Sequence, residues 1–87
     1  MINNAFKIAV IESEAGWGRK IDNYMVCLSL EDIESFRTEF NSKNDSDSTP
    51  DWYMQVEGDP ISIYLNDNQY ECVFNEKKVW LSRLKNV

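Results

Sequence analysis

The stretch Leu28-Ser-Leu-Glu-Asp-Ile-Glu-Ser-Phe-Arg-Thr-Glu-Phe40 decides the fold, because it contains the start and the apolar face of one helix. Ser29 is a good N-cap, since its hydroxyl can accept a hydrogen bond from a free amide of the first turn. Three apolar residues follow the i, i+3, i+7 spacing of a single stripe: Ile33, Phe36 and Phe40. We therefore predict a helix that begins after Ser29. It should end near residues 42–44, where an asparagine can serve as the C-terminal cap.

Two strands are predicted before this helix. Residues 5–12 and residues 21–28 both alternate along the chain and include several β-branched side chains, which is typical of strands. Residues 13–20 contain Gly16-Trp17-Gly18 and are predicted to be a connection. Because this connection is short, antiparallel pairing of the two strands is the simplest arrangement.

The second half of the sequence predicts a series of short strands. Residues 41–51 are small and polar apart from Lys43, and indicate a loop. Alternating patterns then predict three or four strands, at residues 52–57, 61–65 and 70–74, with one more short strand at 79–81. Gly58-Asp59-Pro60 should break the first from the second, and turns are expected at residues 66–68 and 75–77. Residues 82–87 fit the tail of this sheet or a helical turn equally well.

Together these elements predict an α+β fold. We expect an antiparallel sheet of about five to six strands with one helix packed on one face. The chain has 87 residues, which supports one domain over residues 1–87.

Charge and composition exclude several classes of function. Nine Lys and Arg residues stand against fifteen Asp and Glu residues, for a formal charge of -6, and there is no histidine. A chain without histidine has no Ser-His or Cys-His catalytic pair and no imidazole metal ligand. A net negative chain is also a poor binder of nucleic-acid backbones.

The sequence predicts a cytoplasmic protein. Its first residues lack the charged start, apolar stretch and cleavage site of a signal peptide. No apolar run is long enough to cross a bilayer, so no membrane contact is expected. Cys27 and Cys72 are far apart in the chain, and we expect two buried thiols and no disulfide or metal clamp.

Neither a catalytic group nor a cofactor is predicted. Asp45, Asp47 and Asp51 are spaced like the opening of a calcium loop, but Pro50 and Val56 occupy the positions that need Gly and Glu. These aspartates are expected to lie in a solvated loop, and cation binding by them stays open. No nucleophile–base pair is recognisable, so an enzyme is not expected.

Three residues are candidates for contact with another protein. Trp17 lies between two glycines and close to Arg19, which is the composition of an interface hot spot. The alternative is that Trp17 folds back over the sheet, and the need of a small chain for a large core favours this alternative. Tyr53 alternates with Trp52 and Met54, which we predict to be core, so Tyr53 should face outward.

The acidic balance suggests one further role. Clustered carboxylates can imitate DNA phosphates and occupy the basic groove of a nucleic-acid enzyme. Here the acids are spread along the chain and interrupted by cations, a pattern that favours solubility over mimicry.

The chain resembles a group of small uncharacterised proteins of tailed bacteriophages. The resemblance rests on three segments: Glu14-Ala-Gly-Trp-Gly18, Phe40-Asn-Ser-Lys-Asn44 and Pro50-Asp-Trp-Tyr-Met54. It implies a phage origin and transfers no catalytic or binding residue. Small phage proteins of this kind often bind and inhibit host enzymes or defence systems.

The leading hypothesis is thus a non-enzymatic phage accessory protein that binds a host protein in the host cytoplasm through Trp17, Arg19 and Tyr53. A DNA-mimic inhibitor of a nucleic-acid enzyme is the alternative. A small hydrolase that uses carboxylates and a metal is the second alternative. A homodimer that hides an uncovered sheet edge is a further hypothesis.

Overall fold

The protein consists of one four-stranded sheet and three helices over the residues that the computed structural model describes, 3–44 and 51–85. The strands are β1 (Asn4–Glu14), β2 (Gly18–Cys27), β3 (Trp52–Tyr64) and β4 (Lys78–Trp80). The helices are α1 (Leu30–Lys43), α2 (Asp67–Glu76) and α3 (Leu81–Leu84). All neighbours in the order β3-β1-β2-β4 are antiparallel. This confirms the α+β class and the antiparallel sheet, whereas about five to six strands and a single helix were wrong.

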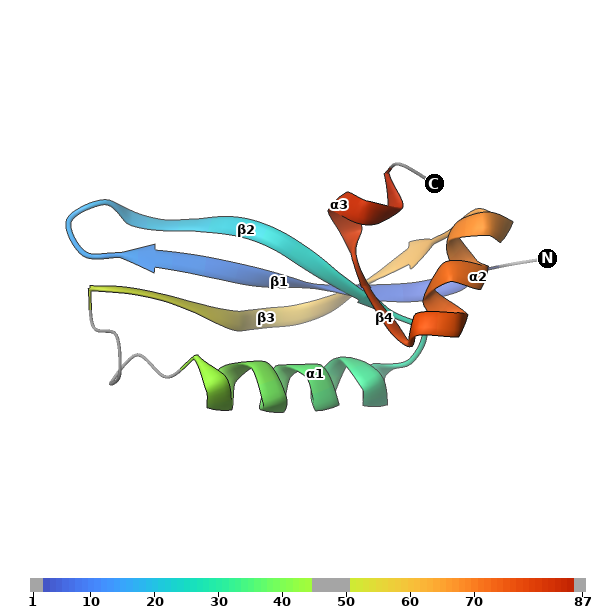
Figure 1. The fold of residues 1–87 in the computed structure, drawn as a ribbon, viewed down its shortest axis with the longest axis horizontal. Coiled ribbons are helices and arrows are strands. Elements are labelled where there is room, and N and C mark those ends of the chain that lie inside the picture. Colours follow the sequence, from blue (N-terminus) through green and yellow to red (C-terminus); the bar gives the residue numbers. More distant parts are fainter. Residues whose placement is uncertain (1–2, 45–50, 86–87) are drawn as a thin grey trace.

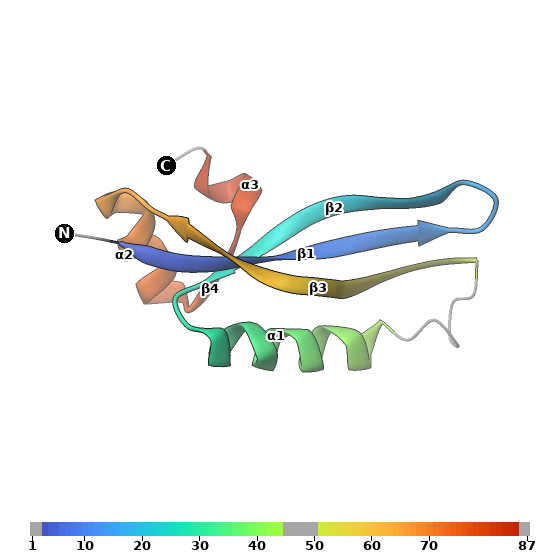
Figure 2. The ribbon, with the colours of Figure 1, turned by 180° about the vertical axis from the view of Figure 1, so that it is seen from behind.

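The strands β1, β2 and β3 form a long arm. Figures 1 and 2 show α1 running along this arm beside β3, with α2 and α3 at the end opposite the β1–β2 hairpin tip. The molecule is accordingly elongated, with extents of 45 × 23 × 19 Å. No helix within the described ranges is long and apolar enough to cross a membrane.

Helix α1 begins and ends as predicted. The Ser29 hydroxyl accepts a hydrogen bond from the Asp32 amide at 3.1 Å. At the other end, the Asn44 amide donates to the Phe40 carbonyl at 3.1 Å. Ile33 and Phe36 are buried on the face toward the sheet. Local caps and one apolar stripe are sufficient to specify this helix.

The strand predicted at residues 70–74 is wrong, because these residues belong to α2. Asn66 and Gln69 form a capping box: the Gln69 amide donates to the Asn66 side chain at 2.8 Å, and the Asn66 amide donates to the Gln69 side chain at 3.0 Å. The polar run at residues 66–68 therefore starts a helix and does not turn a hairpin. Val73 is buried, whereas Phe74 is 65% exposed.

The break predicted at residues 58–60 is also wrong, because β3 runs through it. Lys7 pairs with Ile61 and Ala9 pairs with Glu57, so Gly58-Asp59-Pro60 lies opposite the single residue Ile8. This is a bulge, in which Gly58 adopts a φ of +85°. Because β1 continues past it, pairing resumes beyond the bulge and one long strand results.

The predicted connection at residues 13–20 is shorter than expected. β1 extends to Glu14 and β2 begins at Gly18, which leaves only residues 15–17 in the loop. At the other end of the chain, residues 81–84 form the short helix α3. Of the two structures predicted for residues 82–87, the helical turn is therefore the one found over the described residues. The short predicted strand at 79–81 corresponds to β4.

Two apolar cores lie on opposite faces of the sheet. The first packs α1 against the sheet and consists of Ile8, Val10, Met25, Cys27, Ile33, Phe36 and Val56. The second packs α2 and α3 against the other face, near the end of the arm, and consists of Ala5, Val26, Leu65, Val73, Val79 and Leu84. The first face carries the helix that the sequence predicted. The second carries α2, which was predicted as a strand, and α3, where a helical turn was one of two open readings.

Polar side chains of α1 cover part of the β3 edge. The Asn41 side chain donates to the Val56 carbonyl at 3.2 Å and accepts from the Val56 amide at 2.8 Å. Arg37 donates to the Gly58 carbonyl at 2.6 Å. These contacts satisfy backbone groups that would otherwise be free to pair with another strand. They reduce the edge that a homodimer could use.

Candidate interaction surfaces

Arg19 and Tyr53, two of the predicted contact residues, lie on the same face of the arm. Ser13 of β1 pairs with Arg19 of β2 on one side and with Tyr53 of β3 on the other. Directly paired residues of antiparallel strands project from the same face. The sheet thus brings together two residues that are 34 positions apart in the sequence.

A second row of side chains continues this face. Ile11 pairs with Ile21 and with Gln55. Neither apolar core includes Ile11, Ile21 or Tyr53. Ile21 is 52% exposed, and the side chains of Ile11 and Tyr53 are half-buried. We define the open face as Ile11, Ser13, Arg19, Ile21, Tyr53 and Gln55.

The cationic side chains on and beside the open face contact neighbouring side chains. The Arg19 guanidinium donates to the Ser13 hydroxyl at 3.2 Å and forms an ion pair with Glu57. Further along the same face, the Lys7 ammonium lies 4.3 Å from the centre of the Tyr24 ring. Arg19 is therefore orientated before any partner arrives, which lowers the entropy that it would lose on binding.

The third predicted contact residue, Trp17, lies at the tip of the β1–β2 hairpin and is 82% exposed. Gly16 and Gly18 on either side have φ values of +83° and +88°, a region that favours glycine. Neither apolar core of the described residues includes Trp17, so its side chain lies outside both cores. The alternative that Trp17 folds back over the sheet is wrong.

Trp52 was predicted to be core and is instead 47% exposed. It pairs with Glu14 near the tip, beyond the C-terminal end of α1, and its indole N–H donates to the Glu12 carboxylate at 2.9 Å. Its predicted companions behave differently: Val56 is buried and Met54 is half-buried against the first core. The alternation was correct, but the helix does not reach far enough to cover Trp52.

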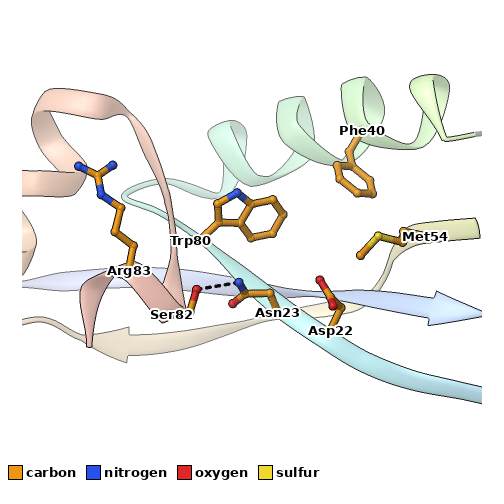
Figure 3. Close-up of a pocket in the computed structure, with 7 residues that line it drawn as sticks. All are labelled: Asp22, Asn23, Phe40, Met54, Trp80, Ser82 and Arg83. Carbon is orange, nitrogen blue, oxygen red and sulfur yellow. Dashed lines mark hydrogen bonds between the residues drawn. The ribbon is translucent and has the colours of Figure 1, made fainter. Parts of the chain in front are cut away.

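A hollow of about 670 Å³ lies on the α1 side of the sheet. Phe40 of α1, Met54 of β3 and Trp80 of β4 supply its apolar wall, and Figure 3 shows these three side chains next to one another above Asp22. The centres of these two rings are 6.4 Å apart, and their planes meet at 79°. All three side chains pack at the margin of the first core and remain partly accessible.

Polar groups form the rim of the hollow. Asp22 and Asn23 come from β2, and Ser82 and Arg83 come from α3. The Asn23 side chain donates to the Ser82 hydroxyl at 2.9 Å (Figure 3), and Arg83 forms an ion pair with Glu76. Sequence reasoning missed this site, because its seven residues come from five different elements and no local pattern connects them.

A metal centre has no counterpart in the described residues, where no group of three or more His, Cys, Asp or Glu side chains could hold an ion. Asp51 is exposed and lies just before β3. Asp45 and Asp47 lie outside the described residues, so the expectation for these two aspartates stays a prediction.

The two thiols have different surroundings. Both cysteines are free: Cys27 is buried, as expected, but Cys72 is only partly buried. Burial raises the pKa of the Cys27 thiol to about 11, with a smaller contribution from the charge of Asp32. A hydrogen bond to the Glu76 carboxylate raises the pKa of the Cys72 thiol.

We predict that iodoacetamide at pH 8 will modify only Cys72 in the native protein. About a thousandth of a thiol with the pKa of Cys27 is ionised at that pH, and the thiolate is the reactive form. Intact-mass spectrometry should therefore find one label before unfolding and two labels in urea. Two labels on the native protein would contradict the burial of Cys27.

No protein-family model, curated protein or solved structure matches the chain. Its function is therefore inferred from the chemistry of the surfaces described above.

Proposed function

We propose that the protein is a non-enzymatic binding module, a phage accessory protein that acts on a protein of the host cell. The observation that supports this most is the open face, where apolar side chains and a positioned arginine lie on a rigid three-stranded arm. The arm ends in the exposed Trp17. Tyrosine, tryptophan and arginine are the residue types that dominate the energetics of protein interfaces.

The arm suits a contact with a folded partner. β1 pairs with β2 over residues 6–14 and with β3 over residues 4–14, with one bulge in each pairing, so the contact surface is ordered before binding. Ile11 and Ile21 provide a small apolar centre, while Arg19 and Gln55 provide a polar margin. An apolar centre with a polar rim is the usual arrangement of an interface.

The acidic residues give less support to a DNA mimic. Among the described residues, ion pairs place Arg37 beside Glu34, and both Lys43 and Lys78 beside Glu39. The acids of α1 are thus interleaved with cations, whereas mimicry needs a continuous face of one sign.

Affinity capture from bacterial lysate, with and without infection, tests this proposal. We expect a specific host protein to be recovered with the wild-type chain and lost with the double variant Trp17→Ser and Tyr53→Ser. Truncating one such hot spot should weaken binding by about thirtyfold. Both side chains lie outside the cores, so the variants should remain folded.

Tyr64→Ser is the matched control, because Tyr64 is an aromatic residue 77% exposed at the other end of β3. It should retain the partner. Recovery of no specific protein, or equal recovery by all variants, would contradict the proposal. Light scattering tests whether the open face instead binds a second copy of this chain. A wild-type dimer that becomes a monomer in the double variant would assign the open face to self-association.

A further inference from the structure

The Asp22 carboxylate is aimed into the aromatic hollow by a β-bulge. Val10 pairs with Asn23 and Ile11 pairs with Ile21, so Asp22 is an extra residue of β2 with no partner on β1. Successive residues of a regular strand point to opposite faces. The bulge breaks this alternation, and Asp22 and Asn23 both line the hollow. Figure 3 shows the carboxylate directed toward the space between Trp80, Phe40 and Met54.

This carboxylate is available to a ligand. Among the described residues, Asp22 takes part in none of the ion pairs. The one cation on the rim, Arg83, is already paired with Glu76. The hollow thus combines aromatic walls with a single uncompensated negative charge, and its complement is a cation on an apolar stem.

The same aromatic cluster already attracts a cation of this chain. The Lys78 ammonium lies 5.7 Å from the centre of the Phe36 ring, and Phe36 packs edge-on against Trp80 at 5.9 Å. Cations are drawn to aromatic faces by the negative charge density of the rings. Phe40 and Trp80 of the same cluster also line the hollow.

We infer that the hollow binds an arginine side chain of a partner protein. The methylene stem would lie against Met54 and Phe40, and the planar guanidinium would stack on Trp80 and donate to Asp22. Arginine fits better than lysine, because its guanidinium is planar, weakly hydrated and able to bond a carboxylate through two N–H groups. This inference rests on the proposed function, which supplies the partner protein that would carry the arginine. The hollow is a separate site from the open face.

A titration with a blocked tripeptide that carries a central arginine tests this inference without the partner. We expect the Trp80 indole N–H and the Asn23 amide signals to shift in ¹H–¹⁵N spectra, with a dissociation constant in the millimolar range. Replacing arginine by its neutral isostere citrulline should weaken binding by about tenfold, since the ion pair and the cation–π contact are both lost.

Asp22→Asn should weaken binding of the arginine peptide by a similar factor. Asp59→Asn is the control, because it removes the same charge from the exposed bulge of β3, away from the hollow. Equal binding of the arginine and citrulline peptides, no effect of Asp22→Asn, or an equal effect of Asp59→Asn would overturn the site. Equal binding of a lysine peptide would overturn the choice of arginine.

The outcomes separate this inference from the proposed function. Tripeptide binding that depends on Asp22, without any host protein that depends on Trp17 and Tyr53, would retain the hollow and reject the open face. Recovery of a host protein that depends on Trp17 and Tyr53, without any shift of the Trp80 signal by the tripeptide, would retain the open face and reject the hollow.

Discussion

Val73→Asp is expected to destabilise the protein by about 3 kcal/mol or more, because it places a charge in an apolar core without a partner. Val73 is fully buried in α2, among the residues that pack against the face of the sheet opposite α1. A native chain of this size is stable by only roughly 5–15 kcal/mol, so the substitution removes a large share of the free energy of unfolding. Urea denaturation followed by tryptophan fluorescence would measure the loss.

Phe74→Asp is the matched control and is expected to change stability by less than about 1 kcal/mol, since surface substitutions have small effects. The two substitutions distinguish a helix from a strand at this position. In the strand predicted from the sequence, Phe74 would share the face of Cys72, which was predicted to be buried, and Val73 would lie on the opposite face, so the effects would be reversed. If Val73→Asp does not fold, Val73→Ala keeps the comparison, with an expected loss of about 1.5 kcal/mol from two buried methyl groups.

Ile33→Ala is expected to cost about 2–5 kcal/mol, the range for large-to-small substitutions in a core. Ile33 is fully buried in the first turn and a half of α1 and belongs to the core beneath that helix. Alanine has the higher helix propensity, so any loss reflects packing and the cavity left behind. Thermal or urea unfolding of the purified variant measures the change in free energy.

Leu30→Ala is the control for Ile33, because Leu30 lies in the same helix and is about half exposed. It should change stability by less than about 1 kcal/mol. Equal losses for Ile33→Ala and Leu30→Ala would show that α1 does not pack on the sheet through the stripe that begins at Ile33.

The candidate surfaces were predictable only in part. A tryptophan between two glycines already indicated that Trp17 could be presented on a turn, and the parity of Tyr53 indicated that it faces away from Val56. The sequence contains no signal that Arg19 lies opposite Ser13 and in line with Tyr53, because that row depends on the register of three strands. The hollow was not predictable at all, since a single extra residue in β2 decides where Asp22 points.

The errors in the fold have a common physical origin. Alternation over five residues cannot separate a strand from a short helix, and the capping box of Asn66 and Gln69 was the local signal that favoured a helix. A glycine and a proline at residues 58–60 suggested a break, but a bulge accommodates both residues when the neighbouring strand continues. Trp52 has the parity of a core residue and lies beyond the end of the helix that would cover it.

By itself, the sequence determined the elements whose signals are local. Helix α1 follows from its cap and its apolar stripe, and the first two strands follow from their alternation and the short connection between them. Tertiary structure alone decided the continuity of β3, the face covered by α2 and α3, and the exposure of Trp17 and Asp22. These features depend on pairing and packing between residues far apart in the chain. The conformation that is most stable for one segment depends on which other segment pairs with it or buries its apolar side chains.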